Sequence, residues 1–475
     1  MGCCNVNPDN QYDLIIVGGG SSAFAAAIKA NDQEIKTLIV NGGLPLGGTC
    51  VNVGCVPSKF LIRAGESVYK ASYSSFKGIM PNKPKINFRE IIEQKRELVA
   101  DMQQRKYADL LAGLPYVQVI EGMAKFVGDR TIEVEGEEYQ GLKVILATGA
   151  STYIPNIDGL NTVPYLTNIT LFELDEQPAS LTVLGGGYIA LEIAQAYNRL
   201  GTKVTLLQRS TSILSKQAKD ITDEIAKHLV DDGINILTGT TINKVWKDGE
   251  EIKVNITQNG NNDTITSSHL LVATGIKANT EKLGLEKIKV NVDKQGYIIV
   301  DEFLQTSNPE VFAVGDVTNL PAYVYTAAYE GSVALQNAFY NPKQKVDFTA
   351  LPWVVFTDPQ IAGVGMDEKE AEEKGIPYQV TVLPLSEVPR SIASLDTRGF
   401  IKLIRNPETD LLLGARIVAP EGSEIIMEVS LAIKYKIPVH ELTAMFHPYL
   451  TLSEGIKLAA LSFTTDVKKM SCCVS

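Results

Sequence analysis

The sequence lacks any run of about 18 apolar residues, the length that a helix needs to span a bilayer. Basic residues are also in deficit, since 44 Lys and Arg stand against 55 Asp and Glu and the net charge is −11. This charge argues against nucleic acid or an anionic membrane surface as the main partner. The first residues lack the basic start and apolar stretch of a secretory signal, and Val6 breaks the myristoylation pattern. We therefore expect a cytoplasmic protein that binds neither nucleic acid nor membrane.

Cysteine is scarce as well, with six in 475 residues, which excludes a secreted disulfide scaffold. The six fall into three close pairs: Cys3 with Cys4, Cys50 with Cys55, and Cys472 with Cys473. In a large protein of a reducing compartment, such pairs indicate redox chemistry or soft-metal binding. The length itself predicts two to four domains.

Two segments of the chain share one plan of strand, glycine turn and helix. Their strands are Tyr12–Val17 and Leu181–Leu184, and the turns that follow are Gly18-Gly-Gly20-Ser-Ser-Ala23 and Gly185-Gly-Gly187-Tyr-Ile-Ala190. Each segment continues into a second strand, ending at Val40 or Leu207, and later into a strand closed by Ala-Thr-Gly, at Gly149 or Gly275.

Such glycines allow a tight turn and let backbone N–H groups approach a pyrophosphate at the start of the helix. The small Ala23 and Ala190 let helix and strand pack closely. One such motif is weak evidence, but two in the same context predict two bound dinucleotides.

The segment GGTCVNVGCVPSK, from Gly47 to Lys59, resembles the redox-active segment of the pyridine nucleotide–disulfide oxidoreductases. TSNPEVFAVGDV at 306–317 and VVFTDPQIAGVG at 354–365 resemble further motifs of that family, in the same order. The resemblance implies an α/β fold with two Rossmann-like dinucleotide-binding domains, for FAD and NADPH, plus a C-terminal α+β dimerisation domain. The expected boundaries are 10–158 and 282–345 for FAD, 159–281 for NADPH, and 346–475 for dimerisation. Within the second FAD segment, 287–292 and 297–300 are expected to be short strands.

The spacing of Cys50 and Cys55 has a structural consequence. Five residues of regular helix advance about 7.5 Å, whereas a disulfide needs Cα atoms roughly 4.4–6.8 Å apart. A bond between the two therefore requires irregular backbone, which Gly54 makes easier. The alternative is a pair of buried, unpaired cysteines.

The resemblance implies roles for the residues around this pair. Cys55 would lie nearer the flavin and Cys50 would be the exchanging thiol. Lys59 would lie near the flavin and pair with Glu192, although both could instead be solvated surface charges. Tyr188 would cover the flavin until nicotinamide arrives. The FAD site would comprise Gly18, Gly20, Ala23, Asn41, Gly43, Gly48, Thr49, Lys59, Ala124, Asp316 and Val324.

One position departs from the family pattern. Asn41 stands where members usually carry a Glu that holds the adenosine ribose, so we expect a weakened contact. The choice between Gly42 and Gly43 as FAD contact stays open for the same reason.

The second unit indicates which nicotinamide cofactor binds. An acidic residue after the second strand usually holds the ribose 2′-hydroxyl of NAD, but Gln208 and Arg209 stand there. A guanidinium suits a 2′-phosphate and predicts NADPH. The expected site comprises Gly185, Gly187, Ala190, Arg209 and Gly275.

The C-terminal segment FHPYLTLSEG differs from the proton-shuttling His/Glu dyad of disulfide-reducing members. Tyr449 aligns with the dyad histidine, and His447 lies two residues too early. A phenol with a pKa near ~10 is a poor acid–base group at neutral pH but suits a soft-metal pocket as a neighbour or weak ligand.

The chain ends in KKMSCCVS, whose adjacent thiols can relay one soft ion. With Tyr449, this tail resembles the mercuric-ion-reducing branch of the family. The resemblance implies NADPH-dependent reduction of Hg(II) to Hg(0) through FAD and the Cys50/Cys55 pair. Thiolate-bound Hg(II) would be delivered by Cys472 and Cys473 of the partner subunit, in a homodimer with shared active sites. The mercury ligands would be Cys50, Cys55, Cys472 and Cys473. The alternatives are a general NADPH-dependent thiol or disulfide reductase, a metal-sequestering protein, and a tail with incidental thiols.

Overall fold

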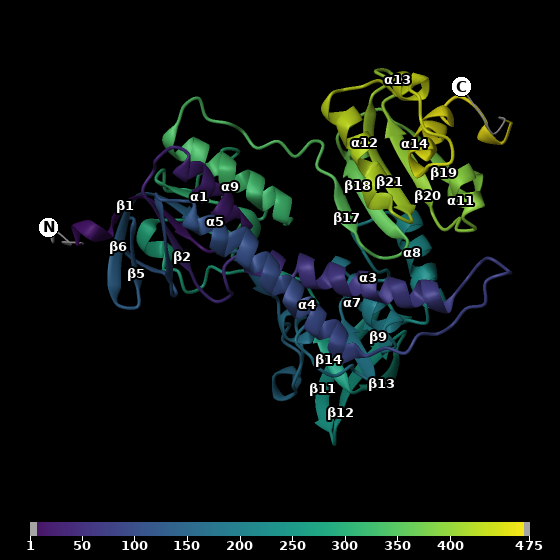
Figure 1. Cartoon of the computed structure of the whole chain (residues 1–475), viewed down its shortest axis with the longest axis horizontal. Coiled ribbons are helices and arrows are strands. Elements are labelled where there is room, and N and C mark those ends of the chain that lie inside the picture. Colours follow the sequence, from purple (N-terminus) through teal and green to yellow (C-terminus); the bar gives the residue numbers. More distant parts are fainter. Residues whose placement is uncertain (1–6, 470–475) are drawn as a thin grey trace.

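The computed structural model describes residues 7–469, whose elements gather into three lobes (Figure 1). The lobes correspond to three sheets: one of seven strands, one of four strands, and one of five strands. In Figure 1 the lobe of the first sheet lies at the left, that of the second at the bottom, and that of the C-terminal sheet at the upper right. No helix of these residues is long and apolar enough to cross a membrane.

The seven-stranded sheet carries the first glycine turn. Its order is β3-β2-β1-β6-β5-β4, with β16 paired to β6, and β1 pairs in parallel with both β2 and β6. Leu14, Ile15 and Ile16 of β1 are fully buried, as expected of a parallel strand covered on both faces. Helices α1 and α9 pack together on one face (Figure 1). The bounds are β1 Gln11–Val17, β2 Thr37–Asn41, β3 Val117–Glu121, β4 Lys125–Gly128, β5 Thr131–Val134, β6 Glu137–Leu146, β16 Val311–Ala313, α1 Ser21–Asn31 and α9 Val324–Phe339.

The four-stranded sheet repeats this plan around the second glycine turn. Its parallel order is β10-β9-β8-β14, and a three-stranded antiparallel sheet, β11-β12-β13, accompanies it. Strands β7 and β15 form a separate two-stranded antiparallel sheet. The bounds are β7 Ala150–Thr152, β8 Ser180–Leu184, β9 Lys203–Leu207, β10 Asn235–Leu237, β11 Thr240–Asp248, β12 Glu251–Gln258, β13 Asn261–Ser267, β14 His269–Val272, β15 Ile276–Ala278, α7 Tyr188–Arg199 and α8 Lys219–Asp231.

The expected strands at 287–292 and 297–300 are wrong. Residues Leu285–Ile288 form a 3-10 turn, and Lys289 follows with a φ of 56° in the left-handed region, so the chain turns there. Ile298 forms only isolated bridges, to Val292 and to Thr318. The apolar residues of these segments alternate because one side of each segment is buried, although neither segment pairs as a strand.

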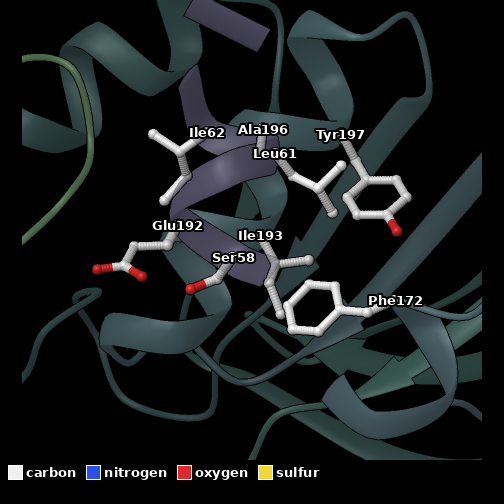
Figure 2. Close-up of a pocket in the computed structure, with 8 residues that line it drawn as sticks. All are labelled: Ser58, Leu61, Ile62, Phe172, Glu192, Ile193, Ala196 and Tyr197. Carbon is white, nitrogen blue, oxygen red and sulfur yellow. The ribbon is translucent and has the colours of Figure 1, made fainter. Parts of the chain in front are cut away.

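The helices that follow β2 and precede β3 pack against the second unit. Helix α3 packs along α7 of the second sheet, and Gly65 permits the approach, because a side-chain carbon there would lie 3.0 Å from the carbonyl oxygen of Ala196. Figure 2 shows the seam, with Ser58, Leu61 and Ile62 of α3 beside residues of α7. The bounds are α2 Gly48–Val53, α3 Cys55–Ser72, α4 Phe88–Gln103, the π-helical turn η2 Gln104–Ala108, α5 Asp109–Ala112 and α6 Asn168–Leu171.

The C-terminal lobe is an antiparallel sheet of order β17-β18-β21-β20-β19, with α12 packed on β18 and β21. Its apolar core includes Val364, Leu403 and Val429, all fully buried. The bounds are β17 Trp353–Val355, β18 Gln360–Gly365, β19 Gln379–Pro384, β20 Phe400–Arg405, β21 Leu412–Ala419, α10 Glu368–Glu373, α11 Pro389–Ala393, α12 Gly422–Lys434, α13 Val439–Ala444 and α14 Leu452–Leu461.

Candidate active site

The first glycine of each turn is required by the strand that closes the unit. Gly18 has a φ of 124°, and a side-chain carbon there would lie 2.1 Å from the carbonyl oxygen of Ala147. Gly185 has a φ of 117°, and its side-chain carbon would lie 2.3 Å from the carbonyl oxygen of Ala273. Both alanines begin the Ala-Thr-Gly sequences, so the two repeated motifs of each unit fit against each other.

The third glycines instead border open space. A side-chain carbon at Gly187 would meet no atom within 4 Å, and one at Gly20 would only touch the Cα of Gly48, at 4.0 Å. Gly20 and Gly187 are the N-caps of α1 and α7, and as glycines they have no side chain that could cap the N–H groups of these helices. The two helix N-termini therefore present backbone N–H groups to a ligand, which fits a dinucleotide pyrophosphate.

The ends of the second strands carry the side chains that face the middle glycines. A carbon on Gly19 would lie 2.1 Å from Oδ1 of Asn41, and a carbon on Gly186 would lie 3.1 Å from the side chain of Gln208. Arg209, one residue beyond Gln208, is exposed. It forms no ion pair within the part of the chain that the structure describes, so its guanidinium is available to a phosphate.

The redox segment lies directly on the first turn. The N–H of Gly47 donates to the carbonyl oxygen of Gly19 at 2.8 Å. A side-chain carbon on Gly48 would lie 2.8 Å from the Cα of Gly20, so only glycine fits there. Thr49 follows, and Gly43 and Gly275, each with positive φ, border open space.

Cys50 and Cys55 are free thiols on two helices that break at Gly54. The expectation of an irregular backbone between them is thereby confirmed. A hydrogen bond from Cys50 lowers the pKa of the Cys55 thiol to about 7, with Lys59 also lowering it while burial and Glu192 oppose. The same hydrogen bond, together with burial, raises the pKa of Cys50. Cys55 is therefore the first of the two to become a thiolate.

Lys59 and Glu192 form an ion pair, with Nζ 2.7 Å from Oε2, although 133 positions separate them. The Glu192 side chain is only 7% exposed, which excludes the alternative of two solvated surface charges. Its other oxygen accepts the N–H of Phe356 at 2.9 Å, and the Phe356 ring lies 4.6 Å from the Lys59 ammonium. A segment of the C-terminal lobe thus holds the pair in place.

Tyr188 begins α7 and stacks on Trp353, with ring centroids 5.9 Å apart. Its hydroxyl accepts a hydrogen bond from Gln217 at 3.0 Å, and burial raises its pKa. The aromatic pair lies over the start of the helix that bears Glu192. This position is compatible with the expected role as a cover.

Asp316 lies in the short turn after β16, where burial raises the pKa of its carboxyl. The preceding Gly315 donates its N–H to Oε2 of Glu330, at 2.6 Å. Glu330 is fully buried, and burial raises its pKa to about 7. Val324 begins α9 nearby in the fold, and Ala124 is buried in the core of the same sheet.

Two tyrosines near the thiols were not anticipated from the sequence. Tyr107 lies in the π-helical turn and hydrogen-bonds to Ser21. Burial, together with negative charge on Cys50 and Cys55, raises the pKa of its hydroxyl. Burial, together with negative charge on Cys55, raises the pKa of Tyr325 to about 12. No local pattern marks either one, although π-helical turns concentrate at functional sites.

Tyr449 is half exposed, on the loop between α13 and α14. His447 is no substitute for a dyad histidine, because its side chain is 5% exposed and its Nε2 lies 2.7 Å from Oε1 of Glu428. Glu454, which would complete the dyad, accepts the N–H of Leu450 at 3.2 Å.

The remaining cysteines, Cys3, Cys4, Cys472 and Cys473, lie outside the described residues. Within residues 7–469, no group of three or more His, Cys, Asp or Glu side chains is arranged to hold a metal ion. Cys50 and Cys55 are the only cysteines within residues 7–469, so any thiolate site for mercury built from this range alone would consist of that pair.

The site thus has two dinucleotide turns, a dithiol next to the first of them, and a lysine–glutamate pair between the two units. These features define an oxidoreductase that moves electrons between a nicotinamide, a flavin and a pair of thiols. Family models agree: that of the pyridine nucleotide-disulphide oxidoreductases matches residues 12–331, and that of their dimerisation domain matches residues 351–460. The chain belongs to the pyridine nucleotide-disulphide oxidoreductase family. The predictions of an α/β two-dinucleotide fold, of FAD and NADPH as cofactors, and of an FAD-dependent enzyme are confirmed.

Comparison with known proteins shows which members of this family the chain is similar to. The chain is 44% identical to the mercuric reductase of Staphylococcus aureus over 467 residues, covering 98% of this chain and 85% of that protein. It is 41% identical to the mercuric reductase of Streptomyces lividans, covering 97% and 98%. The HOCl-induced flavoprotein disulfide reductase RclA from Escherichia coli matches with a TM-score of 0.86 at 28% identity, covering 96% of this chain and all of that one. The resemblance to mercuric reductases is thereby confirmed.

Proposed function

We propose that this enzyme reduces Hg(II) to Hg(0) with electrons from NADPH, using Cys50 and Cys55 as the thiolates that hold the ion. One observation carries the proposal: Cys55 ionises near neutral pH beside a second thiol, while tyrosine replaces the dyad histidine. A dithiol that reduces disulfides needs a proton donor for the leaving thiol. A dithiol that exchanges ligands on a soft cation needs thiolates instead.

The bonds, protons and electrons balance when Hg(II) binds to the two sulfurs and leaves as Hg(0). Two Hg–S bonds form to Cys50 and Cys55 while the two carrier thiolates leave, and the protons of the pair pass to solvent and return once the ion has left. Two electrons then reduce the ion, both Hg–S bonds break, and the neutral atom leaves because it has little affinity for thiolates. Each ion reduced consumes one NADPH and releases NADP⁺ and a proton. Tyr107, next to both thiols, is suited to contact the ion during exchange.

The fold suggests which residues hold the cofactors. Gly18, Gly20, Asp316 and the N-terminus of α1 would hold FAD, which when bound relays electron pairs from NADPH to the dithiol. The second turn and Arg209 would hold NADPH. Lys59, fixed by Glu192, would place a positive charge beside the Cys55 thiolate. We assign 10–158 and 282–345 to the FAD domain, 159–281 to the NADPH domain and 346–475 to the dimerisation domain.

Delivery of mercury is the finer part of the proposal. The match to a dimerisation domain supports a homodimer, in which Cys472 and Cys473 of one subunit would pass the ion to Cys50 and Cys55 of the other. Tyr449, on an exposed loop of the dimerisation domain, would complete the shared site.

The competing function is general disulfide reduction, favoured by the likeness to a flavoprotein disulfide reductase. NADPH oxidation in excess thiol, followed with mercuric ion, glutathione disulfide or lipoamide, separates the two. Mercury-dependent oxidation far above that with either disulfide supports our proposal. A preference for a disulfide would contradict it.

A further inference from the structure

The end of strand β2 lacks the acidic residue that dinucleotide-binding units use for a ribose. Such units place a carboxylate after the second strand, where it accepts hydrogen bonds from ribose hydroxyls. Here Asn41 ends β2 and is 2% exposed. An amide can accept one such bond, but it carries no charge.

The hydrogen bonds of Asn41 fix which way its amide points. Nδ2 donates to the carbonyl oxygen of Leu44 at 3.1 Å and to Oε2 of Glu121 at 2.8 Å. Both partners are acceptors, so the nitrogen must face them, and Oδ1 faces Gly19. The two N–H groups of Asn41 are thus already used within the protein.

Glu121 ends β3, the strand next to β2, in direct register with Asn41. The N–H of Gly122 donates to the carbonyl oxygen of Asn41 at 2.8 Å, which holds the two strand ends together. Glu121 is exposed. Its second oxygen, Oε1, accepts no hydrogen bond from any residue between 7 and 469. The carboxylate is therefore oriented by one oxygen while the other remains available.

We propose that Glu121 is the carboxylate that binds the adenosine ribose of FAD, held in place by Asn41. The negative charge has moved one strand outward, from the end of β2 to the end of β3. Asn41 then acts as a positioning residue, because its amide orients Glu121 without the repulsion that a second carboxylate would bring. This inference rests on the proposed assignment of the first glycine turn to FAD.

Affinity of the flavin-free protein for separate probes tests this directly. Glu121→Gln removes the charge from a hydrogen-bond acceptor and should weaken FAD binding roughly tenfold to a hundredfold, as read by flavin fluorescence. ADP, which shares the adenosine and diphosphate, should lose affinity by the same factor in competition with FAD. FMN, which lacks adenosine, should bind as before. Glu133→Gln, an exposed change on strand β5 of the same sheet, is the matched control.

A charge exchange adds a second, independent measurement. Asn41→Glu alone should weaken FAD binding, because it sets two carboxylates side by side. Combining Asn41→Glu with Glu121→Gln should restore most of the affinity. Unchanged FAD and ADP binding in Glu121→Gln would overturn the proposal, as would an equal loss for FMN, which would indicate a general disturbance of the fold. An enzyme that binds FAD through Glu121 but does not reduce mercury would refute the proposed function and leave this inference intact.

Discussion

Replacing Cys50 with Ala should raise the pKa of Cys55, because the Cys50 hydrogen bond is the largest influence that lowers it. An ordinary cysteine has a pKa of about 8.5, whereas Cys55 has one of about 7. Without the Cys50 donor, burial and Glu192 oppose Lys59 and a backbone hydrogen bond, and burial is the largest of these influences. We therefore expect a pKa at or above the ordinary value.

The size of the effect follows from these values. The difference between a pKa of about 8.5 and one of about 7 corresponds to about 2 kcal/mol of preference for the thiolate. At pH 7 the thiolate fraction would fall from about one half to about 3%. The rate of alkylation by iodoacetamide at pH 7 should therefore fall about fifteenfold.

The assay is the pH dependence of alkylation of the reduced protein, with Cys3, Cys4, Cys472 and Cys473 replaced by Ala in every variant. Cys50→Ser keeps a hydroxyl donor and should hold the pKa of Cys55 near 7. Lys59→Met should raise it less than Cys50→Ala does. If Cys50→Ala leaves the pKa near 7, Lys59 is the dominant influence and our ordering of causes is wrong.

Three further predictions concern other parts of the chain. Arg209→Glu should reduce the ratio of kcat/KM for NADPH over NADH by roughly tenfold or more, since it removes a 2′-phosphate partner; an unchanged ratio would place the phosphate elsewhere. Burial raises the pKa of Glu330 to about 7, so the folded state keeps a proton that the unfolded state loses above about pH 4.3. Stability to denaturant should thus fall by about 4 kcal/mol as pH rises from about 4 to about 7; Glu330→Gln should abolish this decline, and an unchanged decline would exclude Glu330 as its source. Changing both Cys472 and Cys473 to Ala should preserve reduction of the Cys50/Cys55 pair by NADPH but abolish turnover of mercury bound to bulky thiols, with mercuric bromide less affected; full activity on thiol-bound mercury would return the tail to incidental thiols.

The duplicated plan could be predicted from sequence because its determinants are local. Each glycine turn, its preceding apolar strand and its following helix lie within about 20 residues, and the structure has them as β1–α1 and β8–α7. The irregular backbone at Gly54 could likewise be expected from sequence, because a bond between cysteines five residues apart does not fit a regular helix. Local alternation misled at 287–292, where the left-handed Lys289 turns the chain.

Contacts between distant segments could not be predicted from pattern alone. The Lys59–Glu192 pair followed only from the family resemblance, since nothing near either residue identifies its partner. The approach of Tyr107 and Tyr325 to the thiols depends on how α3, α9 and the π-helical turn pack. Glu121 could not be singled out either, because its role arises from the register of β3 against β2.

The most direct test of the central claim is the amount of elemental mercury released per NADPH oxidised, with Hg(II) supplied as a thiolate complex. We expect one Hg(0) per NADPH for the native protein and none for Cys55→Ser or Cys50→Ser. NADPH oxidation without release of Hg(0), or release that survives loss of either cysteine, would contradict it.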